Sequence, residues 1–221
     1  MIDQQDFDSI RNLHGDFLAG IAGGQRADFR KKDLSGLKLA DADLSTALLV
    51  ATKATSCELT DVVLSGADMF CADFRAAVLV ACDLRRIDGR GIDFGGARLG
   101  NCDLRESDLR PGMLLKAGAW TGEEVATSFA GATMSGANLS GAVLRGAKLR
   151  RVVLKPAEIR DRDGRRTGRR VSASLVDCDL RAADFAESDL RAAVLTRAQM
   201  RGARFTRARL DGAQLPARVT A

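Results

Sequence analysis

Six arginines lie close together between residues 160 and 170 and form a candidate binding cluster. They are Arg160, Arg162, Arg165, Arg166, Arg169 and Arg170. Guanidinium groups bind phosphates, nucleic acid and acidic protein surfaces, so the cluster suits any of these partners. Trp120 is a second candidate contact residue, because an exposed aromatic side chain next to a basic loop makes a plausible contact pair. The alternative interpretation of the arginines is a solvated loop without a partner.

Catalytic and metal-binding patterns are missing from the sequence. His14 is the single histidine, which excludes every mechanism or zinc site that needs two. The cysteines are odd in number and form no CxxC pair, which is typical of reduced thiols in a cytosol; they are Cys57, Cys71, Cys82, Cys102 and Cys178. No glycine-rich phosphate loop with its lysine occurs either. We therefore predict a protein that is not an enzyme and has no metal or cofactor.

Charge and hydropathy indicate a cytoplasmic protein without a membrane contact. No apolar stretch is long enough to span a bilayer, and the acidic residues Asp3 and Asp6 make the first residues unlike a leader peptide. The formal net charge of +5 is unevenly distributed. Residues 1–115 sum to −4 and residues 116–221 to +9, so an acidic half precedes a basic one.

A five-residue period organises the chain from Ala27 onward. Leu, Phe or Met recurs at the centre of nearly every unit, as at Leu64, Met69, Phe74 and Leu79, and a small residue stands two positions before each centre. Neither an amphipathic helix nor a simple alternating strand has this spacing. The two apolar positions of a unit share one face of an extended segment, which leaves three residues to turn a corner. Four cysteines occupy the small position, whereas Cys71 lies outward and is the thiol that we expect to react.

The repeat resembles the pentapeptide-repeat family, whose motif is A(D/N)LXX, from Ala27 to Leu215. The resemblance implies an all-β fold: a right-handed quadrilateral parallel β-helix, a solenoid with four units per coil and the centres inside. Counting degenerate centres at Ala119 and Glu124, we expect about nine coils in a rod of roughly 43 Å. Such a narrow core explains why aromatic residues make up only 5% of the chain.

The repeat divides the chain into six parts. We expect a capping helix and linker over 1–26, a first repeat array over 27–115, an irregular segment over 116–126, a second array over 127–159, an arginine-rich projecting loop over 160–174, and a third array with a short tail over 175–221. Phe7, Ile10, Leu13, Phe17, Leu18 and Ile21 have helical spacing and predict the helix that covers the first coil. If the coils continue without a break, both irregular segments emerge on the same side of the rod.

Aspartates that precede the centres recur every 20 residues and should stack into ladders. The candidate ladder residues are Asp68, Asp88 and Asp108 on one face, Asp73 and Asp93 on the next, and Asp83 and Asp103 on another. The family resemblance suggests an acidic surface that imitates DNA phosphates, as in members that bind DNA gyrase. The alternative is that short Asp side chains hydrogen-bond the turn backbone.

These observations favour a non-enzymatic solenoid that acts as a rigid protein–protein interaction module with an unidentified protein partner. A DNA-mimicking protein that binds DNA gyrase or another topoisomerase, similar to quinolone-protection members, is the first alternative. Binding of nucleic acid or an acidic partner through the basic C-terminal half is the second. The segment after Leu215 is too short for a similar cap, so the last coil is expected to be left bare, to be protected by Pro216, or to pair with a second copy as a homodimer.

Overall fold

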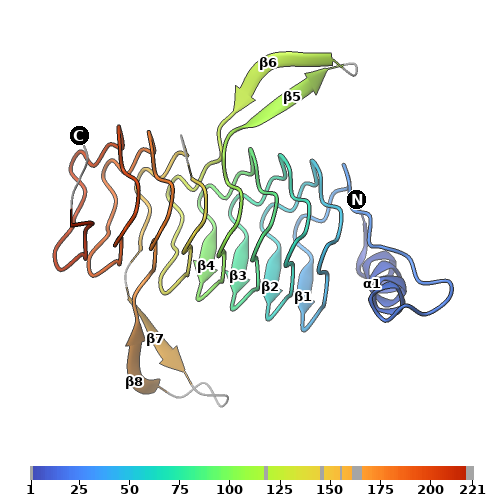
Figure 1. Ribbon diagram of the computed structural model, residues 1–221. Coiled ribbons are helices and arrows are strands. Elements are labelled where there is room, and N and C mark those ends of the chain that lie inside the picture. The colour runs from blue at the N-terminus through green and yellow to red at the C-terminus, as the bar shows by residue number, and fades with distance from the viewer. Residues whose placement is uncertain (1, 117–118, 145–146, 155, 161–165, 218–221) are drawn as a thin grey trace.

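Backbone pairing links each five-residue unit to the unit that stacks on it in the next coil. The computed structural model describes residues 2–116, 119–144, 147–154, 156–160 and 166–217. Asp28 pairs in parallel with Leu48, Leu48 with Asp68, and Asp68 with Asp88, each 20 residues apart. Three further ladders start at residues 33, 38 and 43. Four ladders and a 20-residue coil make a parallel β-solenoid, which Figure 1 shows as a rod.

We number the four ladders by their rungs. Ladder 1 has rungs at 28, 48, 68, 88, 108, 143, 179 and 199; ladder 2 at 33, 53, 73, 93, 128, 148, 184 and 204; ladder 3 at 38, 58, 78, 98, 133, 153, 189 and 209; ladder 4 at 43, 63, 83, 103, 138, 174, 194 and 214. Each ladder therefore has eight rungs among the described residues. The expected nine coils are corrected to eight, because the irregular segments lie outside the coil.

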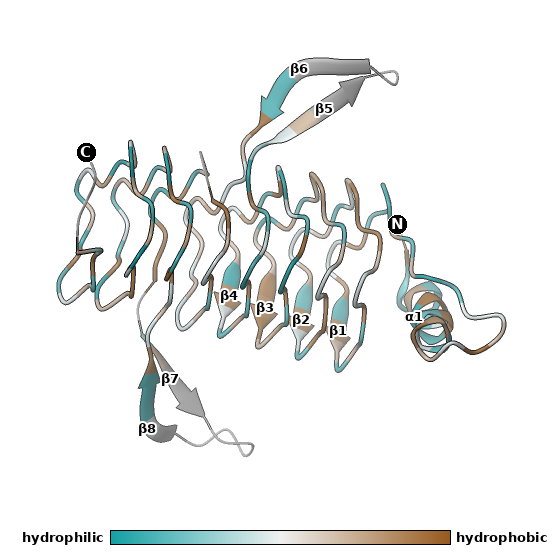
Figure 2. Ribbon diagram, viewed as in Figure 1, coloured by the Kyte–Doolittle hydropathy of each residue, from teal (hydrophilic) through white to brown (hydrophobic). Residues whose placement is uncertain are grey.

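Regular strands occur on one side of the rod. β1 (Lys38–Ala40), β2 (Glu58–Thr60), β3 (Val78–Val80) and β4 (Arg98–Gly100) form a parallel sheet in that order. β3 is apolar over its whole length, whereas the other three strands begin with a charged residue (Figure 2). The remaining ladders, and the later rungs of ladder 3, consist of isolated bridges.

The centres and the small residues point into the rod, as the period predicted. Leu64, Met69 and Leu79 are completely buried, and so is Ala97 at a small position. At five small positions where Ser or Cys replaces Ala, the side chain donates a hydrogen bond to a carbonyl of the preceding coil; they are Cys82, Cys102, Ser107, Cys178 and Ser188. The distance is 2.8 Å both from Ser107 to Leu84 and from Cys178 to Leu139. Thus the core accepts these polar atoms without leaving them unpaired.

Within the described part of the chain, each regular corner contains one residue with a positive φ, two positions after the centre. Examples are Cys71 with a φ of 53° and Gly91 with a φ of 71°. Pro111 and Pro156 occupy the corresponding positions after Leu109 and Leu154. Proline is restricted to a φ near −65° and cannot make this corner. The chain therefore leaves the coil at both prolines.

Both excursions are antiparallel hairpins. β5 (Gly112–Lys116) pairs with β6 (Ala119–Val125), and β7 (Ala157–Arg160) pairs with β8 (Arg166–Val171). The first hairpin lengthens the ladder spacing from 20 to 35 residues, as between Asp108 and Val143, and the second lengthens it to 36. An insertion of three whole units preserves the five-residue phase, whereas the second insertion shifts it by one residue.

The hairpins leave opposite corners of the rod, which corrects the expectation that they share a side (Figure 1). β5 and β6 interrupt the step from ladder 1 to ladder 2, and β7 and β8 interrupt the step from ladder 3 to ladder 4. The expectation counted units at Leu114, Ala119 and Glu124 as three sides of the coil. They belong to the hairpin instead, so the units from Phe129 to Leu154 occupy a different side than expected. Ile159 belongs to the second hairpin, which makes four units outside the coil, so the units from Leu175 onward return to the expected side.

Helix α1 (Gln4–Leu18) closes the N-terminal end of the rod. Asp3 caps the helix by accepting the amide hydrogen of Asp6 at 2.8 Å. Phe7 is buried and stacks on Phe29 of the first coil with ring centroids 5.6 Å apart. The predicted cap is therefore present. Among the residues that the structure describes, no helix has the length and apolarity that a membrane span requires.

Only part of the apolar face of α1 packs against the rod, whereas the sequence predicted that this face covers the first coil. Ile10 packs against the core, but Leu13, Phe17 and Leu18 are 38%, 41% and 39% exposed. Ile21, in the following turn, is 56% exposed. The physical reason is the narrow end of the tube, which offers contact to the few side chains directly over it.

Candidate interaction surface

The side chains of the ladder aspartates accept hydrogen bonds from the backbone at the corners of the coil. In each case Oδ1 accepts the amide hydrogen two residues further on, at 2.9 Å from Ser35 to Asp33 and 2.8 Å from Gly95 to Asp93. The same hydrogen bond forms at the other predicted ladder residues, Asp68, Asp73, Asp83, Asp88, Asp103 and Asp108. This geometry is the Asx turn, in which a side chain replaces a backbone acceptor. A structural role of these aspartates is therefore present at every predicted position.

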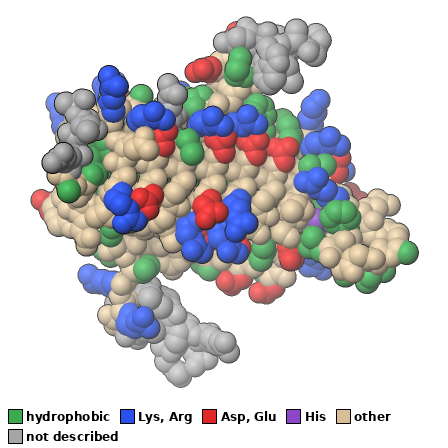
Figure 3. Space-filling view, in the orientation of Figure 1, with side chains coloured by type: hydrophobic (Ala, Val, Ile, Leu, Met, Phe, Trp, Pro, Cys, Tyr) green, Lys and Arg blue, Asp and Glu red, His purple; other side chains and the backbone are tan. Residues whose placement is uncertain are grey.

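Most of these carboxylates form an ion pair with the arginine that stands two residues further along the chain. Arg75 donates from Nε to Oδ1 of Asp73 at 2.8 Å and from Nη2 to Oδ2 at 2.7 Å. The same fork joins Asp83 to Arg85, Asp88 to Arg90, Asp103 to Arg105 and Asp108 to Arg110. The hydrogen bond from Arg75 lowers the pKa of Asp73. Figure 3 shows the resulting rows of basic side chains beside acidic ones.

Two ladder positions depart from this pattern. Asp68 is followed at the same spacing by Phe70, whose ring lies 5.3 Å from the guanidinium carbon of Arg90. Asp93 is followed by Gly95 and has Arg75 Nε at 3.9 Å from its Oδ2. Five of the seven predicted ladder aspartates are therefore paired with an arginine of the same corner.

The arginine partners were not among the predicted site residues, although the sequence contains a signal for them. The spacing Asp-x-Arg recurs at five of the seven predicted ladder aspartates. A spacing of two places both side chains on the outer surface of one corner, where a planar guanidinium can meet a carboxylate with two hydrogen bonds. The Asp-x-Arg spacing can be recognised from the sequence alone.

Hydrogen bonds hold the neck of the first hairpin, where the chain leaves and re-enters the coil, against neighbouring coil residues. Thr127 is buried, and its Oγ1 accepts the amide hydrogen of Gly91 at 2.9 Å and donates to the carbonyl of Arg110 at 2.8 Å. A side chain at Gly112 would crowd the neighbouring coil, because its Cβ would lie 3.0 Å from the carbonyl oxygen of Arg90. These contacts hold the direction in which β5 and β6 project.

Cys71 lies at this neck and does not match the reactive thiol expected from the sequence. Its side chain is only partly exposed, and its Sγ lies against Gly91 and Gly112, 2.9 and 3.0 Å from where their Cβ atoms would be. Burial raises the pKa of the Cys71 thiol, so less of it is present as the nucleophilic thiolate at neutral pH.

The candidate contact residues are divided between the two hairpins. Trp120 lies in β6 opposite Leu115, and its side chain is outside the described part of the structure. Arg160 and Arg166 pair across β7 and β8, while Arg169 and Arg170 are exposed on β8. Arg162 and Arg165 lie outside the described residues. Because the hairpins leave opposite corners, Trp120 is not brought next to the arginine cluster.

Gly136 supports the second hairpin, and a substitution there should loosen it. Its φ is 70°, and a Cβ would come closest to Oδ1 of Asn101 in the coil. The same Cβ would lie 2.7 Å from Cβ of Ala157 and 2.9 Å from Cγ1 of Val171 at the base of β7 and β8. We expect Gly136→Ala to destabilise the protein by about 2 to 4 kcal/mol, from the strained φ and the overpacking together. Urea unfolding followed by circular dichroism measures the loss.

Gly131→Ala is the matched control for this substitution. Gly131 has the same φ of 70°, but a Cβ there meets nothing within 4 Å. The control should lose only the conformational part, about 1 kcal/mol. Equal losses at the two positions would contradict the close packing of Gly136 against Asn101 and the base of the hairpin.

Over the described residues, no three His, Cys, Asp or Glu side chains gather closely enough to hold a metal ion. The chemistry that the surface offers is recognition: charge pairs, arginine forks and two projecting hairpins.

Comparison with known proteins identifies the repeat. The sequence profile of the family described as pentapeptide repeats matches eight copies, over residues 47–86, 126–155 and 173–212. No curated protein sequence matches the chain.

Solved structures with similar coils come from several sources. A trypsin-treated form of QnrB1, a plasmid-mediated fluoroquinolone resistance protein, is 20% identical over 88% of this chain and 81% of its own, with a TM-score of 0.48. HetL, a pentapeptide repeat protein involved in heterocyst differentiation regulation in the cyanobacterium Nostoc sp. strain PCC 7120, is 22% identical over 100% of this chain and 98% of its own, with a TM-score of 0.31.

Proposed function

Because the chain belongs to the pentapeptide-repeat family, we propose that it is a non-enzymatic rod that presents two rigid hairpins to protein partners. We also propose that its coil is the right-handed quadrilateral β-helix that the family resemblance implies. One observation carries the functional proposal: the two hairpins leave opposite corners of the rod, and the contacts of Thr127 and Gly136 hold their necks in place.

The arrangement of the hairpins suits a protein that bridges two surfaces. Six five-residue units, with rungs from 128 to 153, separate the two exits, which is one and a half coils. A single small partner on one side cannot reach both hairpins. The hairpins also differ in charge, with Glu123 and Glu124 in β6 and Arg169 and Arg170 in β8. We therefore propose that the two hairpins contact two different partner surfaces. The partner surface that β7 and β8 contact is acidic.

Excision of the hairpins tests this function. One variant removes residues 112–126 and carries Pro111→Gly; a second removes residues 157–172 and carries Pro156→Gly. Each deletion rejoins the five-residue phase, and glycine permits the positive φ of a regular corner. We expect both variants to fold, and each to retain about a tenth or less of the partner that the intact protein captures.

The measurement is quantitative pull-down from the native lysate, followed by the same comparison with the purified partner. Lys148→Ala is the control, since Lys148 is exposed on the coil between the two hairpins. Circular dichroism confirms that each rod is folded. Undiminished capture by a rod that lacks both hairpins would refute the proposal.

The ion pairs make the DNA-mimic alternative less favourable. A phosphate mimic needs unmatched negative charge, whereas an arginine covers five of the seven predicted ladder carboxylates. A gyrase supercoiling assay with and without fluoroquinolone tests this alternative directly. Binding of nucleic acid through the basic half would instead show affinity that falls steeply with salt.

The proposed homodimer would use the last coil. Phe205 and Leu210 are only partly buried there, and Leu215 is 43% exposed. The same coil carries the exposed arginines Arg201, Arg204, Arg207 and Arg209. Two copies that meet at this end would bring these charges together, so light scattering at low and at high salt is the appropriate measurement.

A further inference from the structure

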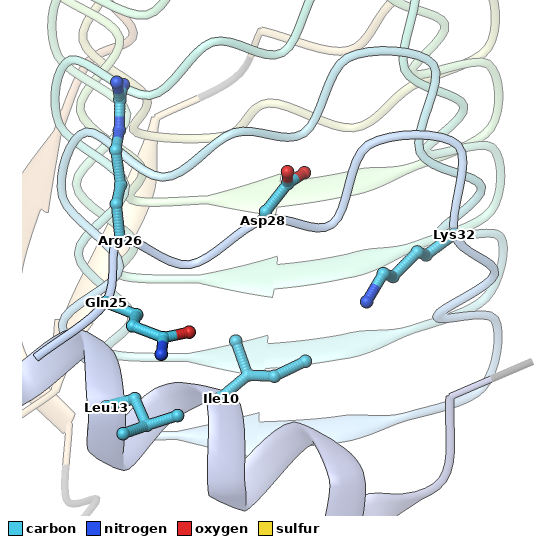
Figure 4. A pocket seen from close by; sticks show the side chains of 6 residues that line it. All are labelled: Ile10, Leu13, Gln25, Arg26, Asp28 and Lys32. Atoms are coloured by element: carbon cyan, nitrogen blue, oxygen red, sulfur yellow. The ribbon is translucent and has the colours of Figure 1, made fainter. Parts of the chain in front are cut away.

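A cleft lies between α1 and the first rung of ladder 1, at the opposite end of the rod from the last coil (Figure 4). Its volume is about 160 Å³, and its walls are formed by Ile10, Leu13, Gln25, Arg26, Asp28 and Lys32. A second hollow of about 350 Å³ continues along the coil and shares Asp28 and Lys32 with the first. The additional walls of this second hollow are Arg30 and Lys31. Together they form a continuous groove beside the first coil.

The backbone at this groove has an unpaired edge. Asp28 pairs with Leu48 on one side, through bonds made by its neighbours Ala27 and Phe29. On the other side, the described residues offer no hydrogen-bond partner to the amide and carbonyl of Asp28 itself. Ladder 2 differs, since the amide of Ile2 donates to the carbonyl of Asp33 at 2.9 Å. The segment before α1 thus covers the edge of ladder 2 and leaves that of ladder 1 open.

The charge around the groove is positive. Asp28 is neutralised by Arg30, whose Nε and Nη2 donate to the carboxylate at 2.9 and 2.5 Å. Lys31 and Lys32 are exposed, and no ion pair to either one occurs within the described residues. Arg26 donates from Nε to the carbonyl of Thr46 at 2.6 Å and is otherwise exposed. Arg26, Lys31 and Lys32 therefore form no ion pair with a carboxylate of the described residues.

The helix side of the groove is apolar. Figure 4 shows Ile10 and Leu13 projecting from α1 below Gln25 and Lys32. Leu13 is 38% exposed, and Phe17 on the same helix is 41% exposed. Apolar surface of this kind favours a ligand that has hydrophobic side chains as well as negative charge.

We infer that this groove binds an extended acidic peptide segment of a partner protein, which adds as a strand to the open edge at Asp28. The backbone of the segment hydrogen-bonds the amide and carbonyl of Asp28, as in strand addition at other sheet edges. An apolar side chain of the segment contacts Ile10 and Leu13, and its carboxylates lie near Lys31 and Lys32. The site is separate from the two hairpins and goes beyond the function proposed for them.

An anionic membrane fits this end of the rod less well. The helix that would approach the lipid carries Asp6, Asp8 and Asp16 against the single cation Arg11. These carboxylates would face a negatively charged headgroup layer. Binding to vesicles is therefore included in the experiment as an outcome that opposes the inference.

The test uses the full chain and a short fluorescein-labelled peptide of alternating Glu and Val, with fluorescence anisotropy as the readout. We expect saturable binding that Lys31→Glu combined with Lys32→Glu weakens about tenfold or more, through loss of two charge contacts and repulsion. Methylating backbone nitrogens of the peptide should weaken binding by a similar factor, because it removes donors to the edge.

The matched control is Lys148→Glu, which changes an exposed lysine far along the rod and should leave the affinity within about twofold. A peptide with Lys in place of Glu should not bind. The inference is overturned by the absence of saturable binding, by equal binding of the Lys peptide, by indifference to backbone methylation, or by phosphatidylserine vesicles that bind the chain while the peptide does not. Circular dichroism verifies the fold of each variant.

Discussion

Phe94→Ala is expected to lower the free energy of unfolding by about 4 kcal/mol. The side chain of Phe94 is completely buried, and its ring centroid lies 5.6 Å from that of Phe74 and 5.2 Å from that of Phe129. Phe94 precedes the first hairpin and Phe129 follows it, so the stack connects the two repeat arrays through the core. Its removal leaves a cavity at the place where the coil is interrupted.

Urea unfolding followed by circular dichroism measures this loss. In a solenoid each coil is stabilised mainly by its neighbours, so a defect in the middle should also reduce cooperativity and lower the m-value. Phe70→Ala is the control, because the Phe70 side chain is half-buried on the outer surface of the coil, where its ring contacts the Arg90 guanidinium. We expect the control to lose about 1 kcal/mol. A comparable loss for both variants would show that the stack does not couple the arrays.

His14→Ala is expected to destabilise the N-terminal cap by about 2 to 4 kcal/mol. The imidazole is completely buried between α1 and the first coil. Its Nδ1 accepts the amide hydrogen of Ala27 at 3.1 Å, so the proton is on Nε2, which donates to the carbonyl of Ser45 at 3.0 Å. Alanine would leave a cavity and two unpaired backbone groups. Hydrogen exchange of the α1 amides measures the loosening of the cap.

The same contacts predict a pH dependence of the cap. Desolvation lowers the pKa of His14 below its ordinary value of 6.5, and protonation of Nδ1 would break the hydrogen bond from Ala27. The unfolded state then binds the proton more readily than the folded state, so stability is fully present above about pH 6.5 and decreases as the pH falls below it. Asp43 and Arg26 act on His14 in opposite directions.

A titration of the histidine by NMR checks the direction of this shift. His14→Gln is the comparison for the stability measurement, because it removes the titrating group and keeps side-chain polarity. Its exchange protection should change little over the same pH range. A His14 pKa above 6.5 in the folded protein would contradict the assignment of the proton to Nε2.

The five-residue period predicted the core because inward and outward positions are set within each unit. Leu79 and Ala97 are buried as the spacing required, and Ser107 and Cys178 are accommodated because their side chains reach a carbonyl of the preceding coil. The cap was also predictable, since Phe7 and its helical neighbours precede the first unit. The exposure of Leu13 and Phe17 was not, because a helical pattern does not reveal how wide a surface it will cover.

The ion pairs were not predicted, although the sequence contains a local signal for them. Asp73 and Arg75 stand in the same order and spacing as Asp103 and Arg105, and a local turn is enough to bring them together. Contacts of this kind depend on the conformation of one corner. They require no knowledge of the rest of the fold.

The sequence by itself determined which residues lie inside the rod and approximately where the coil is interrupted. Only the tertiary structure decided how many units remain in the coil, and therefore on which corners the hairpins emerge. The physical reason is that the period is local, whereas the side on which a unit lies depends on every unit before it. The first hairpin preserves the five-residue phase, so the period alone cannot distinguish three units in the coil from three units outside it.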